Sequence, residues 1–342
     1  MNTGMNTLKH FEQVDKIVPK VYYHYTSLEA LFSIITSKTF RLTSLRSSND
    51  KKELSYSFDK FVKTFLDLCK YESDPEKKEI LHKFKRGMDE DPDTFKKLCK
   101  NDSKPFALCL SKKKDNLTHW DRYAVNCKGV CIGINAAALN VHCQRTAALA
   151  FASDLIEVGS VIYQQKEIED RILTETLKAY KIICEAGTKI TSEDPETVVE
   201  DRGYYFLSSI YSNLARFVKN PSFIDEDEIR MYFDANSIEQ TLRLFDSLNS
   251  DSSGVRTLVE DSRESYLEVV KDFGVEKENF MVTRAGIRSY RNLCLEKIWG
   301  SGTITEIVLG PMCVQNKNEL KAFLKANGLQ GTQISVSKVP IR

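Results

Sequence analysis

The sequence lacks the long apolar runs and the catalytic signatures that would place it in a common functional class. No stretch of its 342 residues approaches the apolar length that crosses a bilayer, and its polar beginning lacks the apolar run of a signal peptide. It has no Walker loop, no GxGxxG, HExxH or GxSxG motif and no set of zinc ligands. These absences argue against the commonest ATPases, dehydrogenases, metallopeptidases and hydrolases. We therefore expect a soluble, cytoplasmic protein that is not held at a membrane.

The charge balance and the cysteines further limit the kinds of protein to which this sequence can belong. A net charge of +1 gives no reason to expect general nucleic-acid binding. The nine cysteines are scattered and none forms a CxxC pair, so we interpret them as reduced, mostly buried thiols of a cytosolic protein. The length fits one large domain, or a domain that carries a sizeable insertion.

The stretch 21–53, VYYHYTSLEALFSIITSKTFRLTSLRSSNDKKE, is the first candidate for a binding site. A short strand ends on His24, and a helix is expected to follow, with Thr26 as its N-cap and Glu29 completing a capping box. A second strand is expected over residues 40–44. A histidine and a hydroxyl at a strand-to-helix junction lie where ligands are commonly held, because the free N–H groups of the helix point there. The alternative is that His24 is a hydrogen-bonded core residue.

Hydrophobic periodicity divides the rest of the chain into a sheet and a helical segment. Residues 167–219 are expected to be mostly helical. Further helices are expected over residues 54–70, 75–86, 93–100, 117–125, 238–248 and 317–326, and strands over 106–111, 129–134, 155–163, 303–309 and 333–338 and around 280–290. The pattern predicts a single α+β domain in which residues 20–165 and 219–342 form the sheet core and 166–218 form a helical insertion.

Two glutamates near residue 228 are the most informative chemical feature. If residues 226–230 form a strand, the carboxylates of Glu226 and Glu228 point the same way, with Cα atoms roughly 6.5–7 Å apart. Like charges at that range raise one pKa or require a cation, and Arg230 is the local candidate. Such a pair can stabilise the oxocarbenium-like state through which glycosidic bonds break. The alternative is a solvated edge strand of alternating charge.

Two other groups of residues also have a functional and a structural interpretation. Trp120 and Tyr123, together with Arg122, could offer a flat surface to a base or a nicotinamide ring, although this spacing is also typical of core packing. The Asn, Asp and Glu of the loop 49–53 could bind a metal. Capping of the helix that follows is the better interpretation of that loop.

Four blocks of the sequence resemble, in order, the motifs of a bacterial family catalogued as a domain of unknown function, number 2971. They are YHYTSLEALFSIITSKTFRLTSL with the loop NDKKE, then CLSKKKDNLTHWDRYAVNCKGVCIGI, then KNPSFIDEDEIR, and a weaker tail that includes IVLGP. The main resemblance runs from about Tyr22 to Arg230. The family name carries no function.

The first block also looks like that of ADP-ribosyltransferases, in which a strand delivers a histidine or arginine to NAD just before a helix. This resemblance implies NAD-dependent transfer of ADP-ribose, or hydrolysis of NAD, in a bacterial stress or phage-defence system, with an unknown acceptor macromolecule. It implies a mixed or split antiparallel sheet of ADP-ribosyltransferase type. The residues that it places around NAD are His24, Tyr25, Thr26, Ser111, Trp120, Tyr123 and Arg230.

The same resemblance gives the two glutamates separate catalytic roles. Glu228 would bond the 2′-hydroxyl of the nicotinamide ribose and stabilise the oxocarbenium ion. Glu226 would orient the acceptor.

Two other functions stay open on the sequence. One is a non-enzymatic module that senses a nucleotide or binds a protein, which would bind its ligand without turnover. The other is a nuclease or other hydrolase that holds a divalent metal between Asp50, Glu53, Glu226 and Glu228. The metal site would require these carboxylates to converge.

Overall fold

The computed structural model describes most of the chain between residues 20 and 341. The described ranges are 20–47, 53–101, 104–139, 156–187, 195–235, 274–283, 286–300 and 302–341, with residues 242, 260, 263–268 and 270–271 between them. The predictions for residues 1–19, for most of the loop 49–53 and for the helix 238–248 lie outside these ranges.

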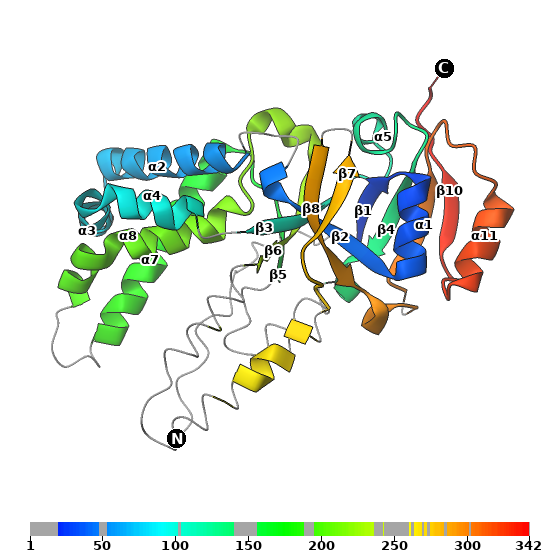
Figure 1. Ribbon diagram of the computed structural model, residues 1–342. Coiled ribbons are helices and arrows are strands. Elements are labelled where there is room, and N and C mark those ends of the chain that lie inside the picture. The colour runs from blue at the N-terminus through cyan, green and yellow to red at the C-terminus, as the bar shows by residue number, and fades with distance from the viewer. Residues whose placement is uncertain are drawn as a thin grey trace.

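The protein is a mixed α/β protein built on one open sheet (Figure 1). Within the described residues the sheet has ten strands, and the pairing of β9 with β10 is parallel whereas every other pairing is antiparallel. The strands are β1 (Val21–Thr26), β2 (Thr39–Ser44), β3 (Pro105–Ser111), β4 (Val130–Asn135), β5 (Ile156–Ser160), β6 (Glu228–Asp234), β7 (Asn279–Thr283), β8 (Gly286–Cys294), β9 (Ile304–Leu309) and β10 (Gln333–Val336). The predicted α+β class with a mixed sheet is confirmed.

The sheet divides into two branches at β3. One edge of β3 pairs along its whole length with β6. On the other edge, Ser111 pairs with Tyr23 of β1, while Phe106 and Ala107 pair with the end of β2. The chain order across the sheet is β10-β9-β4-β1 on one branch and β2-β8-β7 on the other. The two branches therefore diverge from one strand, and an opening is left between β1 and β2.

Helices cover both faces of the β1 branch. The apolar residues of α1 (Leu28–Ser37) and α11 (Lys317–Ala326) join the main core on one face. On the other face, α5 (Leu117–Tyr123) packs through Trp120 against Tyr25. Successive side chains of a strand point to opposite faces, so β1 contributes to both cores.

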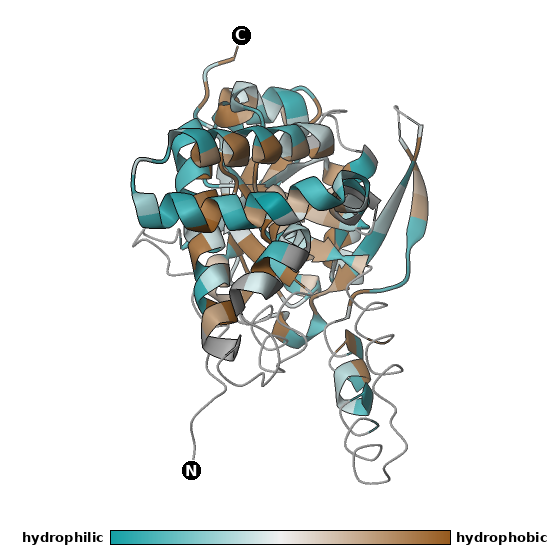
Figure 2. Cartoon of the chain, turned by 90° about the vertical axis from the view of Figure 1, so that its left-hand side faces the viewer, coloured by the Kyte–Doolittle hydropathy of each residue, from teal (hydrophilic) through white to brown (hydrophobic). Residues whose placement is uncertain are grey.

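A separate helical unit lies beside the sheet and has its own core. It consists of α2 (Glu53–Tyr71), α3 (Pro75–Glu90), α4 (Pro92–Asn101), α7 (Gln165–Gly187) and α8 (Pro195–Ala215). Figure 2, which looks onto this unit, shows hydrophilic and hydrophobic residues alternating along its helices, as amphipathic helices require. The unit is larger than the predicted insertion, because α2, α3 and α4 pack with α7 and α8 around one core. Within the described parts of the chain, no helix combines the length and the apolar character of a bilayer span.

The start of α1 differs from the prediction by one residue. Ser27, not Thr26, is the N-cap, and its Oγ accepts a hydrogen bond from the N–H of Ala30 at 3.1 Å. Thr26 pairs with Val130 and ends β1. The predicted Thr26 cap is wrong because the sheet pairing extends one residue further than the local pattern indicates.

Candidate functional site

A cavity of about 600 Å³ occupies the opening between β1 and β2. Its floor is made by β3 and β6, one wall by β1 and α5, and the other wall by β2 and β8. A volume of this size accommodates a nucleotide-sized ligand. Seven of the nine predicted site residues line it: His24, Tyr25, Ser111, Tyr123, Glu226, Glu228 and Arg230. Thr26 and Trp120 do not line this cavity.

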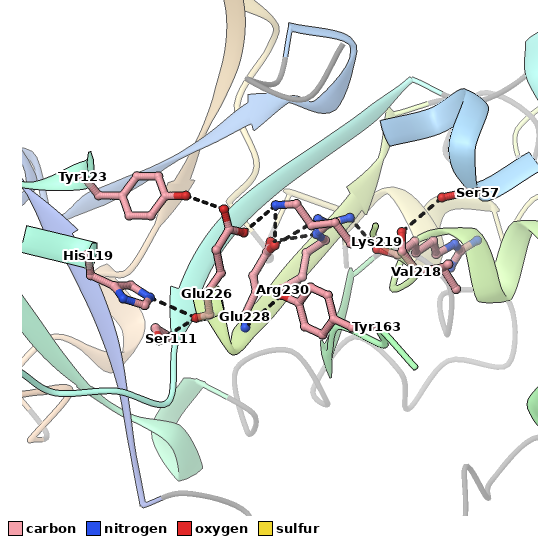
Figure 3. A network of polar contacts seen from close by, with 11 residues as sticks. Ser57, Ser111, His119, Tyr123, Tyr163, Val218, Lys219, Glu226, Glu228 and Arg230 are labelled. Atoms are coloured by element: carbon pink, nitrogen blue, oxygen red, sulfur yellow. Dashed lines mark hydrogen bonds and ion pairs between the residues drawn. The ribbon is translucent and has the colours of Figure 1, made fainter. Parts of the chain in front are cut away.

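Glu226 lies just outside the strand that the sequence predicts for it. It is the last residue of the 3-10 helix η2 (Pro221–Glu226), and Asp227 follows with a left-handed φ of 43°. The strand β6 begins only at Glu228. The prediction of one continuous strand through both glutamates is therefore wrong, because the turn at Asp227 interrupts it. Both glutamates nevertheless line the same cavity, and both carboxylates contact Lys219 (Figure 3).

The backbone of Glu226 is held by side chains from two distant elements. Ser111 Oγ donates a hydrogen bond to the carbonyl oxygen of Glu226 at 2.9 Å, and His119 Nε2 lies 2.9 Å from the same oxygen. The His119 ring is buried, which lowers its pKa, and its Nδ1 lies 2.9 Å from Asn116 Oδ1. Ser111 was predicted to contact the ligand, and this stays a prediction. Its hydroxyl lines the cavity and fixes the peptide that carries the glutamate.

The carboxylate of Glu226 is held in the same way. Tyr123 donates its hydroxyl hydrogen to Oε1, and Lys219 Nζ lies 2.6 Å from Oε2. Burial, followed by the Glu226 carboxylate, raises the pKa of Tyr123, so this phenol remains a donor at neutral pH. Tyr123 thus contacts a glutamate directly, and its predicted stacking on a nicotinamide ring stays a prediction.

Glu228 belongs to a buried ion cluster on the cavity floor. Arg230 Nε lies 2.9 Å from Glu228 Oε1, its second terminal nitrogen lies 3.2 Å from Oε2, and Lys219 Nζ lies 3.1 Å from Oε2. Glu228 is 3% exposed and Arg230 is 1% exposed. Burial alone would raise the pKa of Glu228, but the charges of Arg230 and Lys219 outweigh it and lower the pKa to about 2. The sequence predicted that the glutamate pair requires a cation, and the structure provides two, Arg230 and Lys219.

Lys219, like His119, is a site residue that sequence reasoning missed. Its backbone N–H donates to the carbonyl of Ile162 at 3.0 Å, and Ser57 Oγ of α2 donates to the carbonyl of the preceding Val218 at 3.1 Å (Figure 3). The lysine therefore projects from a segment held between the helical unit and the sheet. Its place as the first residue of KNPSFIDEDEIR was the available signal, although only the fold shows that it contacts both glutamates.

His24 is held at the branch point of the sheet. Its Nδ1 lies 3.2 Å from the carbonyl oxygen of Cys109 on β3, and its ring meets the edge of Phe40 at 5.8 Å between centroids. Removal of water from the ring lowers the pKa of His24, while the hydrogen bond to Cys109 acts in the opposite direction. The neutral ring has one nitrogen left to bind a ligand in the cavity. His24 is therefore a hydrogen-bonded residue of the cavity wall, and its binding of a ligand stays a prediction.

Tyr25 lines the wall of the cavity, and Trp120 packs against it. Tyr25 donates its hydroxyl hydrogen to the carbonyl of Lys113 at 2.8 Å and accepts one from the N–H of Asn116 at 3.1 Å. Trp120 is fully buried, and its indole N–H donates to Asp115 at 2.6 Å. Trp120 is thus a core residue, and Tyr25 joins the loop before α5 to β1.

The structure bears only in part on the metal-dependent alternative. Among the described residues, no group of three or more His, Cys, Asp or Glu side chains is placed to hold a metal ion. Asp50 lies outside the described ranges, and so does the side chain of Glu53.

Comparison with known proteins gives one match. The family model described as "Protein of unknown function (DUF2971)" matches residues 119–231. This match supports the family resemblance seen in the sequence, and it spans Tyr123, Lys219 and both glutamates. It does not include β1 or His24. No curated protein and no solved structure matches the chain.

Proposed function

We propose that the protein binds NAD in the cavity and breaks the bond between nicotinamide and ribose, passing ADP-ribose to an acceptor or to water. The observation that carries the proposal is the convergence of several side chains on Glu226. They are Ser111 of β3, His119 and Tyr123 of α5, and Lys219 of the segment before η2. Such convergence holds a carboxylate in one position beside a ligand-sized cavity. The branching of β1 and β2 from β3 also supports a sheet of ADP-ribosyltransferase type.

The reaction needs a fixed negative charge beside the ribose. As the bond from C1′ to the nicotinamide nitrogen breaks, nicotinamide leaves neutral with the bonding electrons and the ribose carbon becomes positive. An oxygen or nitrogen of the acceptor then bonds to this carbon and loses its proton. When water is the acceptor, the products are nicotinamide, ADP-ribose and a proton. A carboxylate held in place in a site with little water stabilises the positive ribose without moving.

The contacts favour Glu226 for this role over Glu228. Both oxygens of Glu228 bind cations, from Arg230 and Lys219, so most of its charge is already neutralised. Glu226 binds one cation and one phenol. We therefore assign Glu226 to the reacting ribose and Glu228 to the positioning of Lys219.

Release of nicotinamide tests the proposal. The full-length protein is incubated with NAD and a cell extract that supplies acceptors, and nicotinamide is measured by chromatography. Substitution of Glu226 by Gln should lower the rate by about 10²–10³-fold, which is the usual cost of losing one group that stabilises charge in the transition state. Glu296→Gln is the matched control, because this exposed glutamate pairs with Lys38. A protein that neither binds NAD nor releases nicotinamide would contradict the proposal.

Binding without turnover is the second candidate function. The observation that favours it is the same neutralisation of Glu228, which suits a stable pocket as well as a reactive one. Calorimetry that shows NAD binding to the wild-type protein, with no nicotinamide released in any extract, would select this candidate.

A further inference from the structure

The charges that line the cavity are unequal. Five cationic side chains face two carboxylates. The two carboxylates are those of Glu226 and Glu228, and Lys219 and Arg230 bind them on the floor. The three other cations, Arg41, Arg122 and Arg288, line the two walls. The walls therefore carry a net positive charge. On the floor, the two cations balance the charges of the two carboxylates.

Arg41 lines the cavity on the wall formed by β2 and β8, where a neighbouring side chain of that wall holds it. It and Thr43 are two residues apart on β2 and both line the cavity, as the alternation of a strand requires. The guanidinium carbon of Arg41 lies 4.9 Å from the ring centroid of Tyr290 on β8, a contact that limits the freedom of the side chain. Among the described residues, no carboxylate forms an ion pair with Arg41.

Arg122 lines the cavity on the opposite wall, which β1 and α5 form. It lies on α5 next to Tyr123, and α5 is anchored on β1 through the contact of Trp120 with Tyr25. Its side chain is exposed, and in the described part of the chain it has no ion-pair partner either. The two arginines thus belong to the two branches of the sheet and face one ligand-sized opening.

We infer that Arg41 and Arg122 bind the phosphates of the ligand, and that the cleft selects a nucleoside diphosphate group spanning its two walls. This inference rests on the proposed function, since it assigns the phosphates of the same ligand. One guanidinium group can donate two parallel hydrogen bonds to phosphate oxygens, and it remains charged at every physiological pH.

The other cavity residues fit the uncharged parts of such a ligand. His24 has a lowered pKa, so its ring is suited to a ribose hydroxyl or a base edge and not to a phosphate. Glu226 would repel a phosphate, and it lies on the floor, where Tyr123 of the α5 wall contacts it. The phosphates therefore belong at the walls, and a ribose belongs at the floor.

Calorimetric titration of the full-length protein with ADP and with adenosine tests the inference. The wild-type protein should bind ADP more tightly than adenosine. Arg41→Gln and Arg122→Gln should each raise the Kd for ADP by about 10- to 100-fold, the usual cost of a lost hydrogen bond to a charged group. The Kd for adenosine should stay unchanged, and Arg41→Lys should restore part of the affinity. Arg86→Gln is the matched control, because Arg86 pairs with Glu200 within the helical unit.

The outcomes separate this inference from the proposed function. Equal binding of ADP and adenosine by the wild-type protein would overturn it, and so would ADP binding that neither substitution weakens in proteins with unchanged melting temperature. If ADP binding depends on both arginines but no nicotinamide is ever released from NAD, the inference stands and only the proposed turnover fails.

Discussion

Lys219 allows two buried carboxylates to share one site. Its ammonium group lies within hydrogen-bond distance of both Glu226 and Glu228, at 2.6 and 3.1 Å. Arg230 also pairs with one of these carboxylates, that of Glu228, at 2.9 Å (Figure 3). Like charges at short range and with little water are costly, so the lysine has both a structural and a positioning role.

Replacement of Lys219 by Met should therefore destabilise the protein. Removal of one partner from a buried ion cluster leaves charge uncompensated and typically costs about 3–5 kcal/mol. The free energy of unfolding in urea measures the loss. Lys38→Met is the matched control, because Lys38 pairs with Glu296 at the surface, where such pairs contribute about 0–1 kcal/mol. Equal effects of the two substitutions would show that the buried cluster stabilises the protein no more than a surface ion pair does.

The ion pairs of Glu228 also predict a dependence of stability on pH. Its pKa is about 2 in the folded protein, below the value in the unfolded chain, so the unfolded chain takes up a proton first on acidification. The stabilisation is complete above the unfolded pKa and is lost as the pH falls toward 2.

Urea unfolding of wild type and Glu228→Gln between pH 7 and pH 3 measures this dependence. Below about pH 4.5, the difference in unfolding free energy should shrink by as much as about 1.4 kcal/mol per pH unit, which corresponds to one proton. Parallel pH profiles of the two proteins would contradict the low pKa.

At the scale of elements, the helical unit depends on the close approach of α3 and α8. An ideal Cβ added to Gly87 of α3 would lie 2.5 Å from the backbone nitrogen of Gly203 on α8. The two helices therefore meet backbone to backbone, which only glycine allows. Because α8 leads into the segment that carries Lys219, this crossing also contributes to the position of the site.

Substitution of Gly87 by Ala should destabilise the protein by about 1–3 kcal/mol, the usual cost of overpacking. This prediction opposes helix propensity, which favours Ala over Gly by about 1 kcal/mol. Thermal unfolding measures the effect. Gly331→Ala should be nearly neutral, because an added Cβ there meets no atom within 4 Å. A variant at Gly87 that is as stable as the wild type would show that the helices can separate at little cost.

Sequence patterns predicted the elements better than the contacts between them. The helix over 317–326 was predicted with the bounds that α11 has. The structure shows that its signals are local, since Asn316 caps its start and its apolar residues follow one period. The turn at Asp227 was missed, because the alternation that begins at Glu228 was extended back into a run of four acidic residues, 225–228, which has no apolar residue to mark a strand. Local periodicity also cannot show that α2, α3 and α4 pack against α7 and α8, which lie far along the chain. Lys219 was missed for the same reason, because its contacts with the two glutamates depend on how the chain folds and not on local periodicity.

At the scale of the whole molecule, the cavity exists because two branches of one sheet diverge from β3. Only one residue pair joins β1 to β3, and two pairs join β2 to β3. The branches are therefore joined weakly beside the cleft. A ligand that binds Arg41 on one branch and Arg122 on the other would add a link between them.

Hydrogen exchange measured with and without ADP tests this link. Saturating ADP should slow amide exchange in both β2 (Thr39–Ser44) and α5 (Leu117–Tyr123), by up to about 100-fold at 100 times the Kd where exchange requires release of the ligand. Exchange in α11 should not change, since this helix packs in the core away from the cavity lining. In Arg41→Gln the protection of β2 should weaken more than that of α5. Protection confined to one branch in the wild-type protein would mean that the ligand occupies one wall and does not join the two branches.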